Sequence, residues 1–245
     1  MRKLSRVTEA EVIAEFLKGE FYHPEYDRDR IFFEDLVFDP HLSNPAENAL
    51  RRALLFRRRA TMWGELPTDT QWWEIDLEPQ DLERISVFPR AQWRSIARGN
   101  FKALHVAELI HRQFDPARPG DLAAKIHNLR ALMRSEGPRS TILLIGVDEA
   151  KPATLLEGNH RFVASLLLPR EIMLRRLRVV CGFSPGMEKC CWYKTTAVNI
   201  SRYLKNRIKH FWRREADIKS LLPQTVRSQN MEDYASSAEV SSKSE

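Results

Sequence analysis

The sequence predicts an α+β protein, in which a small mixed β-sheet is flanked by helices. The clearest strand signal is Thr141–Val147, an unbroken apolar run of the kind found in strands that are buried on both faces. Two more strands are expected nearby, Ala153–Leu156 and Met173–Phe183, and an earlier one lies around Trp72–Asp76. The resulting order of strand, helices, hairpin, helix and strand is typical of an α+β layout.

Two helices are predicted ahead of this core. Thr8-Glu9-Ala10-Glu11 is a capping box, which begins a helix that ends near Gly19. Asn44-Pro45 supplies a cap followed by a proline in the first turn, so a second helix begins there and ends at Arg57-Arg58-Arg59. The aromatic stretch Phe21–Tyr26 between them is expected to be irregular and packed over the core.

Three further helices are predicted between the first strand and the apolar run. Gly99-Asn100 ends the first of them, Pro119-Gly120 precedes the third, and Gly137-Pro138 ends it. Their apolar residues at helical spacing are Trp93 and Ile96, then Leu104, Ala107, Ile110 and Phe114, then Leu122, Ile126, Leu129 and Met133. The histidines in these helices, His105, His111 and His127, are assigned no function.

The segment Glu157-Gly158-Asn159-His160-Arg161, called the Gly158 turn below, gathers polar groups where a strand becomes a helix. The first N–H groups of a helix have no intrahelical partner and carry partial positive charge, so they attract anions. Gly158 removes the Cβ that would block a phosphate, Asn159 can cap the helix, and Arg161 offers a forked donor. The alternative is an ordinary Gly-Asn corner followed by a solvated arginine.

The Gly158 turn, with Ala164 three residues further on, resembles the signature turn of the ParB/sulfiredoxin superfamily. Upstream, Trp72–Leu77 and the later Phe88-Pro89-Arg90 resemble the family's opening strand and its Pro-Arg segment, and the resemblance extends to Phe183. It implies a ParB/sulfiredoxin-like fold that binds a nucleoside triphosphate, ATP or CTP, together with magnesium. The phosphate-binding residues would be Gly158, Asn159, His160, Arg161 and Arg90, and the catalytic residues Glu157, His160 and Arg161.

Differences between this chain and the family limit which of the family's reactions are expected. Sulfiredoxin carries a cysteine just after the glycine, where this chain has Asn159, so sulfinic acid repair is not expected. No helix-turn-helix like that of the partition proteins is visible downstream. The free-serine kinases have Asp-Gly-His at the turn and a catalytic glutamate after the first strand. Here Glu157 occupies the position of that Asp, and either Glu78 or Glu83 could lie near the position of the catalytic glutamate, which acts as the base.

The 245 residues suit one domain with extensions. We expect an N-terminal helical extension over 1–70, the core over 71–184, a basic helix over 185–223 that packs on the core, and a disordered tail over 224–245. No run approaches the roughly 18 apolar residues of a membrane span, so a cytoplasmic protein is expected. The three cysteines are interpreted as reduced structural thiols, and no metal site is predicted.

A formal net charge of +6 suits anionic partners without choosing among them. The first hypothesis is a nucleotide-binding protein that, if it is an enzyme, catalyses phosphoryl transfer or nucleotide hydrolysis. The second is a non-enzymatic interaction module with a degenerate pocket, which forms a homodimer through its C-terminal helix. The third is a nucleic-acid-binding or nuclease-like protein that uses basic segments such as Arg57-Arg58-Arg59.

Overall fold

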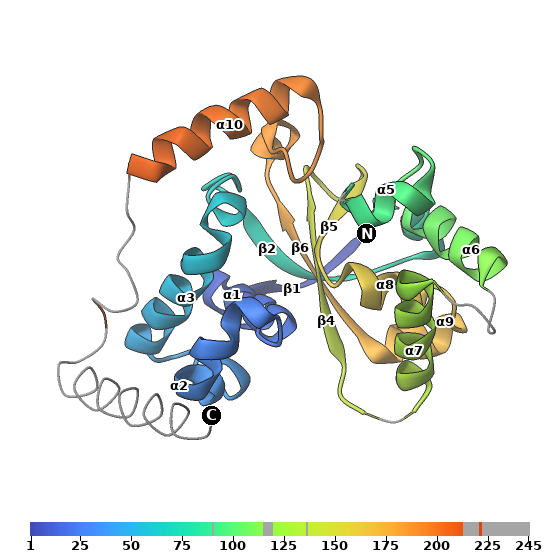
Figure 1. The fold of residues 1–245 in the computed structure, drawn as a ribbon, viewed down its shortest axis with the longest axis horizontal. Helices are drawn as coiled ribbons and strands as arrows, with labels where there is room; N and C mark the ends of the chain where they lie inside the picture. Colours follow the sequence, from blue (N-terminus) through green and yellow to red (C-terminus); the bar gives the residue numbers. More distant parts are fainter. Residues whose placement is uncertain (90, 115–119, 136, 213–220, 222–245) are drawn as a thin grey trace, which may run out of the picture.

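The computed structural model describes residues 1–89, 91–114, 120–135, 137–212 and 221 (Figure 1). Over this part of the chain the protein is α+β, with ten α-helices and a six-stranded mixed open sheet in the order β1-β2-β6-β4-β5-β3. The strands are β1 Arg2–Val7, β2 Gln71–Asp76, β3 Ile85–Ser86, β4 Ser140–Gly146, β5 Ala153–Glu157 and β6 Leu177–Phe183.

The helices divide by position along the chain. Those before the second strand are α1 Glu9–Glu20, α2 Asp27–Phe38 and α3 Pro45–Trp63. Those within the core are α4 Pro79–Leu82, α5 Ala91–Ala97, α6 Ala103–Gln113, α7 Asp121–Arg134, α8 Asn159–Ser165 and α9 Arg170–Arg176. The last is α10 Ala197–Trp212, and two short 3₁₀ helices are η1 Pro24–Tyr26 and η2 Pro185–Lys189.

The sheet has helices on both faces, with α1–α3 on one side and α5–α9 on the other (Figure 1). The central strand β4 pairs in parallel with β6 and antiparallel with β5. Its Ile142 and Leu144 are buried in the cluster beneath α5–α9, whereas Leu143 and Ile145 are buried in the cluster beneath α1–α3. Burial on both faces explains why this strand is apolar throughout, as its sequence predicted.

Several predicted boundaries are confirmed. Thr8 caps α1, since its side chain accepts a hydrogen bond from the Glu11 amide at 3.2 Å. Asn44 caps α3, and Pro45 is its first residue. The aromatic stretch Phe21–Tyr26 matches its prediction only in part, since Phe21 and Tyr26 are fully buried whereas Tyr22 is exposed and Pro24–Tyr26 form the 3₁₀ helix η1.

Other predictions were wrong. The strand predicted from Met173 begins at Leu177, because Pro169 precedes a helical turn formed by Arg170–Arg176. Helix α3 continues past the arginine run to Trp63, but it is kinked at Arg59, where φ is −127° and ψ is 17°, so the predicted end coincides with a break in the helix. Sequence analysis also missed the edge strand β1, whose charged residues hide any apolar alternation, and helix α2.

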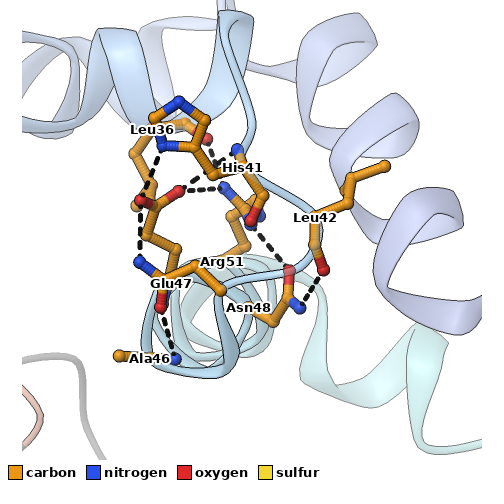
Figure 2. A network of polar contacts seen from close by, with 8 residues as sticks. Leu36, His41, Leu42, Ala46, Glu47, Asn48 and Arg51 are labelled. Atoms are coloured by element: carbon orange, nitrogen blue, oxygen red, sulfur yellow. Dashed lines mark hydrogen bonds and ion pairs between the residues drawn. The ribbon is translucent and has the colours of Figure 1, made fainter.

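A buried arginine holds the connection between α2 and α3 (Figure 2). Arg51 is fully buried and donates hydrogen bonds to the Leu36 carbonyl at 2.9 Å and the His41 carbonyl at 3.1 Å. Its guanidinium also donates to the carboxylate of Glu47 at 3.2 Å and the amide oxygen of Asn48 at 2.6 Å. Because these acceptors lie at the end of α2, in the connection and in the first turns of α3, Arg51 stabilises the junction of the two helices.

Helix α10 turns its polar side toward the protein. Buried Asn199 donates to the carbonyls of Glu188 and Lys194, and Asn206 donates to the Glu65 carboxylate at 2.9 Å. The predicted apolar side of this helix was expected to pack on the core. That expectation is wrong for its exposed residues, which are Ile200, Leu204 and Ile208.

No helix in the described ranges is long and apolar enough to span a bilayer. The tail predicted to be disordered, 224–245, lies outside the described residues. All three cysteines are free and buried, and burial raises the pKa of Cys190 to about 11, as expected of structural thiols.

Candidate functional site

The Gly158 turn joins β5 to α8 through a left-handed glycine. Gly158 has φ +83°, and a Cβ there would lie 2.6 Å from Cδ1 of Ile142 on the central strand. Only glycine combines this backbone conformation with so close an approach to the sheet. The Phe162 amide donates to the Gly158 carbonyl at 2.8 Å, so the amides of Asn159, His160 and Arg161 stand in the first turn of α8, where a helix offers them no acceptor.

Asn159 does not cap α8, contrary to the sequence-based expectation. Gly158 is the N-cap residue, and Asn159 is the first helical residue. Its side-chain oxygen instead accepts a hydrogen bond from the Phe88 amide at 3.2 Å. Because β3 runs parallel to β5, the chain leaving β3 reaches the same end of the sheet as the turn.

This hydrogen bond brings together two segments that the sequence analysis had assigned to one site. Phe88 and Pro89 belong to the predicted Pro-Arg segment, while Arg90 lies outside the described residues. The Phe88 ring stacks on Trp192 with centroids 4.6 Å apart, and Trp192 contacts Tyr203 of α10 edge-on at 6.3 Å. Three aromatic rings therefore connect the neighbourhood of the turn to the C-terminal helix.

His160 packs against α5. Its Nε2 lies 3.2 Å from the side-chain amide nitrogen of Gln92, and its ring centroid lies 5.1 Å from that of buried Trp93. These contacts fix the imidazole beside the first turn of α8. Neither Gln92 nor Trp93 was singled out by sequence reasoning, because a glutamine and a core tryptophan give no functional signal in one sequence.

Glu157 and Arg161 form an ion pair at the turn. The Arg161 guanidinium donates to the Glu157 carboxylate at 2.5 Å, and the side chains are 26% and 11% exposed, respectively. Burial is the largest influence on Glu157 and, with Glu20 nearby, raises its pKa to about 7, although Arg161 and the Gly158 amide oppose the shift. A carboxyl group that titrates near neutral pH suits proton transfer.

The end of α1 covers this ion pair. A Cβ on Gly19 would lie 2.7 Å from the Glu157 carboxyl carbon and 2.9 Å from a guanidinium nitrogen of Arg161. In the sequence Gly19 is interpreted only as the end of a helix. Its contact with Glu157 and Arg161 was not predictable, because these residues are far apart in the chain and meet only when α1 packs on the folded core.

The arginine run lies on α3, where each member has an acidic neighbour. Arg57 contacts Asp29 at 2.5 Å, and Arg58 lies 3.9 Å from the same carboxylate. Arg59 is paired with Glu20 and with Glu25. These pairs hold α1, η1, α2 and α3 together, so the run has a structural use within the N-terminal helices.

Glu78 and Glu83, the alternative candidates for the catalytic base, lie away from the Glu157–Arg161 ion pair. The backbone amide of Glu78 donates a hydrogen bond to the Asp81 carboxylate at 3.0 Å, in the turn that begins α4. Glu83 lines a groove with Lys102, His105 and others beside α6. The hydrogen bonds described connect neither glutamate to Glu157 or Arg161.

Within the described residues, no group of three or more His, Cys, Asp or Glu side chains is arranged to hold a metal ion. Comparison of the chain with protein-family models, curated proteins and solved structures gives no match.

Proposed function

We propose that this protein binds a nucleotide through its phosphates at the Gly158 turn. The observation that carries the proposal is the convergence at one sheet end of a left-handed glycine, the first-turn amides of α8 and the Phe88-Pro89 segment held by Asn159. Amides at a helix start, with no side chain on the residue before them, form a phosphate-binding arrangement. The mixed sheet and the position of the turn suit a ParB/sulfiredoxin-like domain.

In this proposal the phosphates contact the amides of Asn159, His160 and Arg161, and the Arg161 guanidinium exchanges part of its contact with Glu157 for phosphate oxygens. Arg90 would add a further cation. Magnesium would arrive with the nucleotide, since it prefers phosphate oxygens and water to a cage made by the protein alone. ATP and CTP are the triphosphates that the family resemblance suggests.

Turnover would use the same residues. Arg161 would stabilise negative charge on the transferring phosphoryl group, and His160 would donate a proton or hydrogen bond. Glu157, with its pKa near 7, would accept the proton of the attacking hydroxyl group or water. Nucleotide hydrolysis and transfer to a small acceptor are the two reactions consistent with these roles.

The test is a thermal-shift panel of ATP, CTP, GTP, ADP and inorganic phosphate, with and without magnesium. A ligand at a hundred times its dissociation constant adds about 2.7 kcal/mol of stability, and each kcal/mol raises the melting temperature of a chain of this size by about 2–4 °C. We expect one nucleotide to shift the wild type and to lose that effect in Arg161→Ala. The matched control is Arg112→Ala, which removes an exposed arginine with the same i,i+4 pairing to a glutamate, Glu108.

A second candidate is a non-enzymatic interaction module, which one observation favours. Arg161 is already paired with Glu157, and the backbone of Gly19 packs against both. A site closed in this way can serve to fasten α1 to the core. A flat panel, in which no ligand raises the melting temperature of the wild type or of Arg161→Ala above that protein's own ligand-free value, would support this candidate and contradict nucleotide binding.

A further inference from the structure

Helix α10 is amphipathic, but its polar side faces the protein and its aliphatic side faces outward, the reverse of a helix that packs on a core. The hydrogen bonds and the ring contact that join its described residues to the rest of the protein involve Asn199, Arg202, Tyr203 and Asn206, which recur at helical spacing along one side. Three of these four are strongly polar. The side that a globular protein would bury therefore faces outward.

The outward side carries an aliphatic line. Ile200, Leu204 and Ile208 are 39%, 51% and 66% exposed. They stand four positions apart, so they form one row about 12 Å long at the α-helical rise of about 1.5 Å per residue. Val198, 67% exposed, lies at the start of the helix. Such a row of exposed aliphatic side chains marks an interaction surface.

Cations accompany this row. The sequence of α10 contains no Asp or Glu, while Lys205 and Arg207 are exposed. At about 100° per residue, Lys205 and Arg207 fall on opposite sides of the row. Arg202 is half-buried and donates to the Lys189 carbonyl, and the Lys189 side chain is itself exposed near the start of the helix.

We propose that α10 docks on an anionic lipid bilayer, lying in the interface with Ile200, Leu204 and Ile208 directed into it. Long basic side chains on both sides of an apolar row can reach lipid phosphates while the row enters the acyl boundary. Two copies of α10 packed row to row would bring these cations together with no carboxylate of either helix between them. The inner side of the helix is already held by Asn199 and Asn206, so a partner can contact only the outward side. A flat anionic lipid surface contacts that side alone and supplies phosphates for the cations that border the row.

The experiment is vesicle flotation of the full-length chain. Vesicles of phosphatidylcholine alone are compared with vesicles in which about a third of the lipid is phosphatidylglycerol, at low and high salt. We expect at least tenfold tighter binding to the anionic vesicles, and weaker binding at high salt because the cations are exposed. Leu204→Asp should reduce binding at least tenfold. The matched control is Leu132→Asp, which changes a 66% exposed leucine on α7 and should bind as the wild type does.

A second variant tests the charges separately. Lys205→Glu combined with Arg207→Glu should also reduce binding to anionic vesicles at least tenfold, while its circular dichroism spectrum stays that of the wild type. Several outcomes would overturn the proposal: no binding to anionic vesicles, equal binding to both vesicle types, or wild-type binding by Leu204→Asp. A dimer in lipid-free solution that Leu204→Asp converts to a monomer would assign the row to a second copy of the chain instead.

Discussion

Glu157 should make the protein less stable as pH rises toward neutrality. In the unfolded chain its pKa lies near the model-peptide value of 4.5, whereas burial in the folded protein raises it to about 7. Between these values the folded state binds a proton that the unfolded state has lost. Stability contributed by this group is therefore fully present below about pH 4.5 and lost as pH passes about 7.

The size of the effect follows from the shift. A difference of about 2.5 pKa units corresponds to roughly 3 kcal/mol, at about 1.4 kcal/mol per unit. The side chain is only 11% exposed, so solvent screening removes little of this. Most of the loss should occur between about pH 4.5 and pH 7, and it should be absent in Glu157→Gln, which has no proton to release.

The assay is urea unfolding of wild type and Glu157→Gln at half-unit steps of pH. The difference between their free energies of unfolding should change by roughly 3 kcal/mol across the window, whatever the offset between them. The control is Glu108→Gln, which alters an exposed i,i+4 pair worth little in water and should give a curve parallel to the wild type. Parallel curves for wild type and Glu157→Gln would refute the account of a buried, proton-retaining carboxyl group.

Two further stability predictions concern single residues. Gly158→Ala should lower the free energy of unfolding by at least about 2 kcal/mol in urea titrations, because the new methyl meets Ile142 and the backbone is left-handed. Gly120→Ala, with an ordinary φ and open space, should change it by no more than about 0.5 kcal/mol, and equal effects at both sites would contradict this reasoning. Arg51→Met should cost about 3 kcal/mol by chemical denaturation, since the acceptors that Arg51 satisfies become unpaired, and a change within error would show that the network is dispensable.

The sequence was sufficient for those parts of the fold whose signals are local. The apolar run at β4 and the caps at Thr8 and Asn44 are short-range patterns, and each predicted its element. Strand β1 was not predictable in this way, because Arg2–Val7 becomes a strand only by pairing with the distant β2. Helix α10 was predicted as a helix, but its direction of packing depends on hydrogen bonds from Asn199 and Asn206 that no periodicity reveals.

The candidate site likewise has a part that the sequence predicted and a part that depends on distant contacts. A glycine between a strand and a helix predicted the turn, and the structure adds the left-handed conformation that makes glycine necessary. The roles of its neighbours were not accessible, because Phe88, Gln92 and Gly19 reach the turn only through the folded sheet. Asn159 is an example, since its sequence position predicted a helix cap, whereas its side chain accepts a hydrogen bond from Phe88 and so joins a second segment to the turn.

The most direct test of phosphate binding at the Gly158 turn is amide chemical-shift mapping. Isotope-labelled protein would be titrated with the nucleotide that gives the largest thermal shift, followed by inorganic phosphate as a control. The account predicts that the amide signals of Asn159, His160 and Arg161 move most, because these N–H groups receive the phosphate oxygens. Unchanged signals at these three residues, with shifts confined to other parts of the chain, would contradict it.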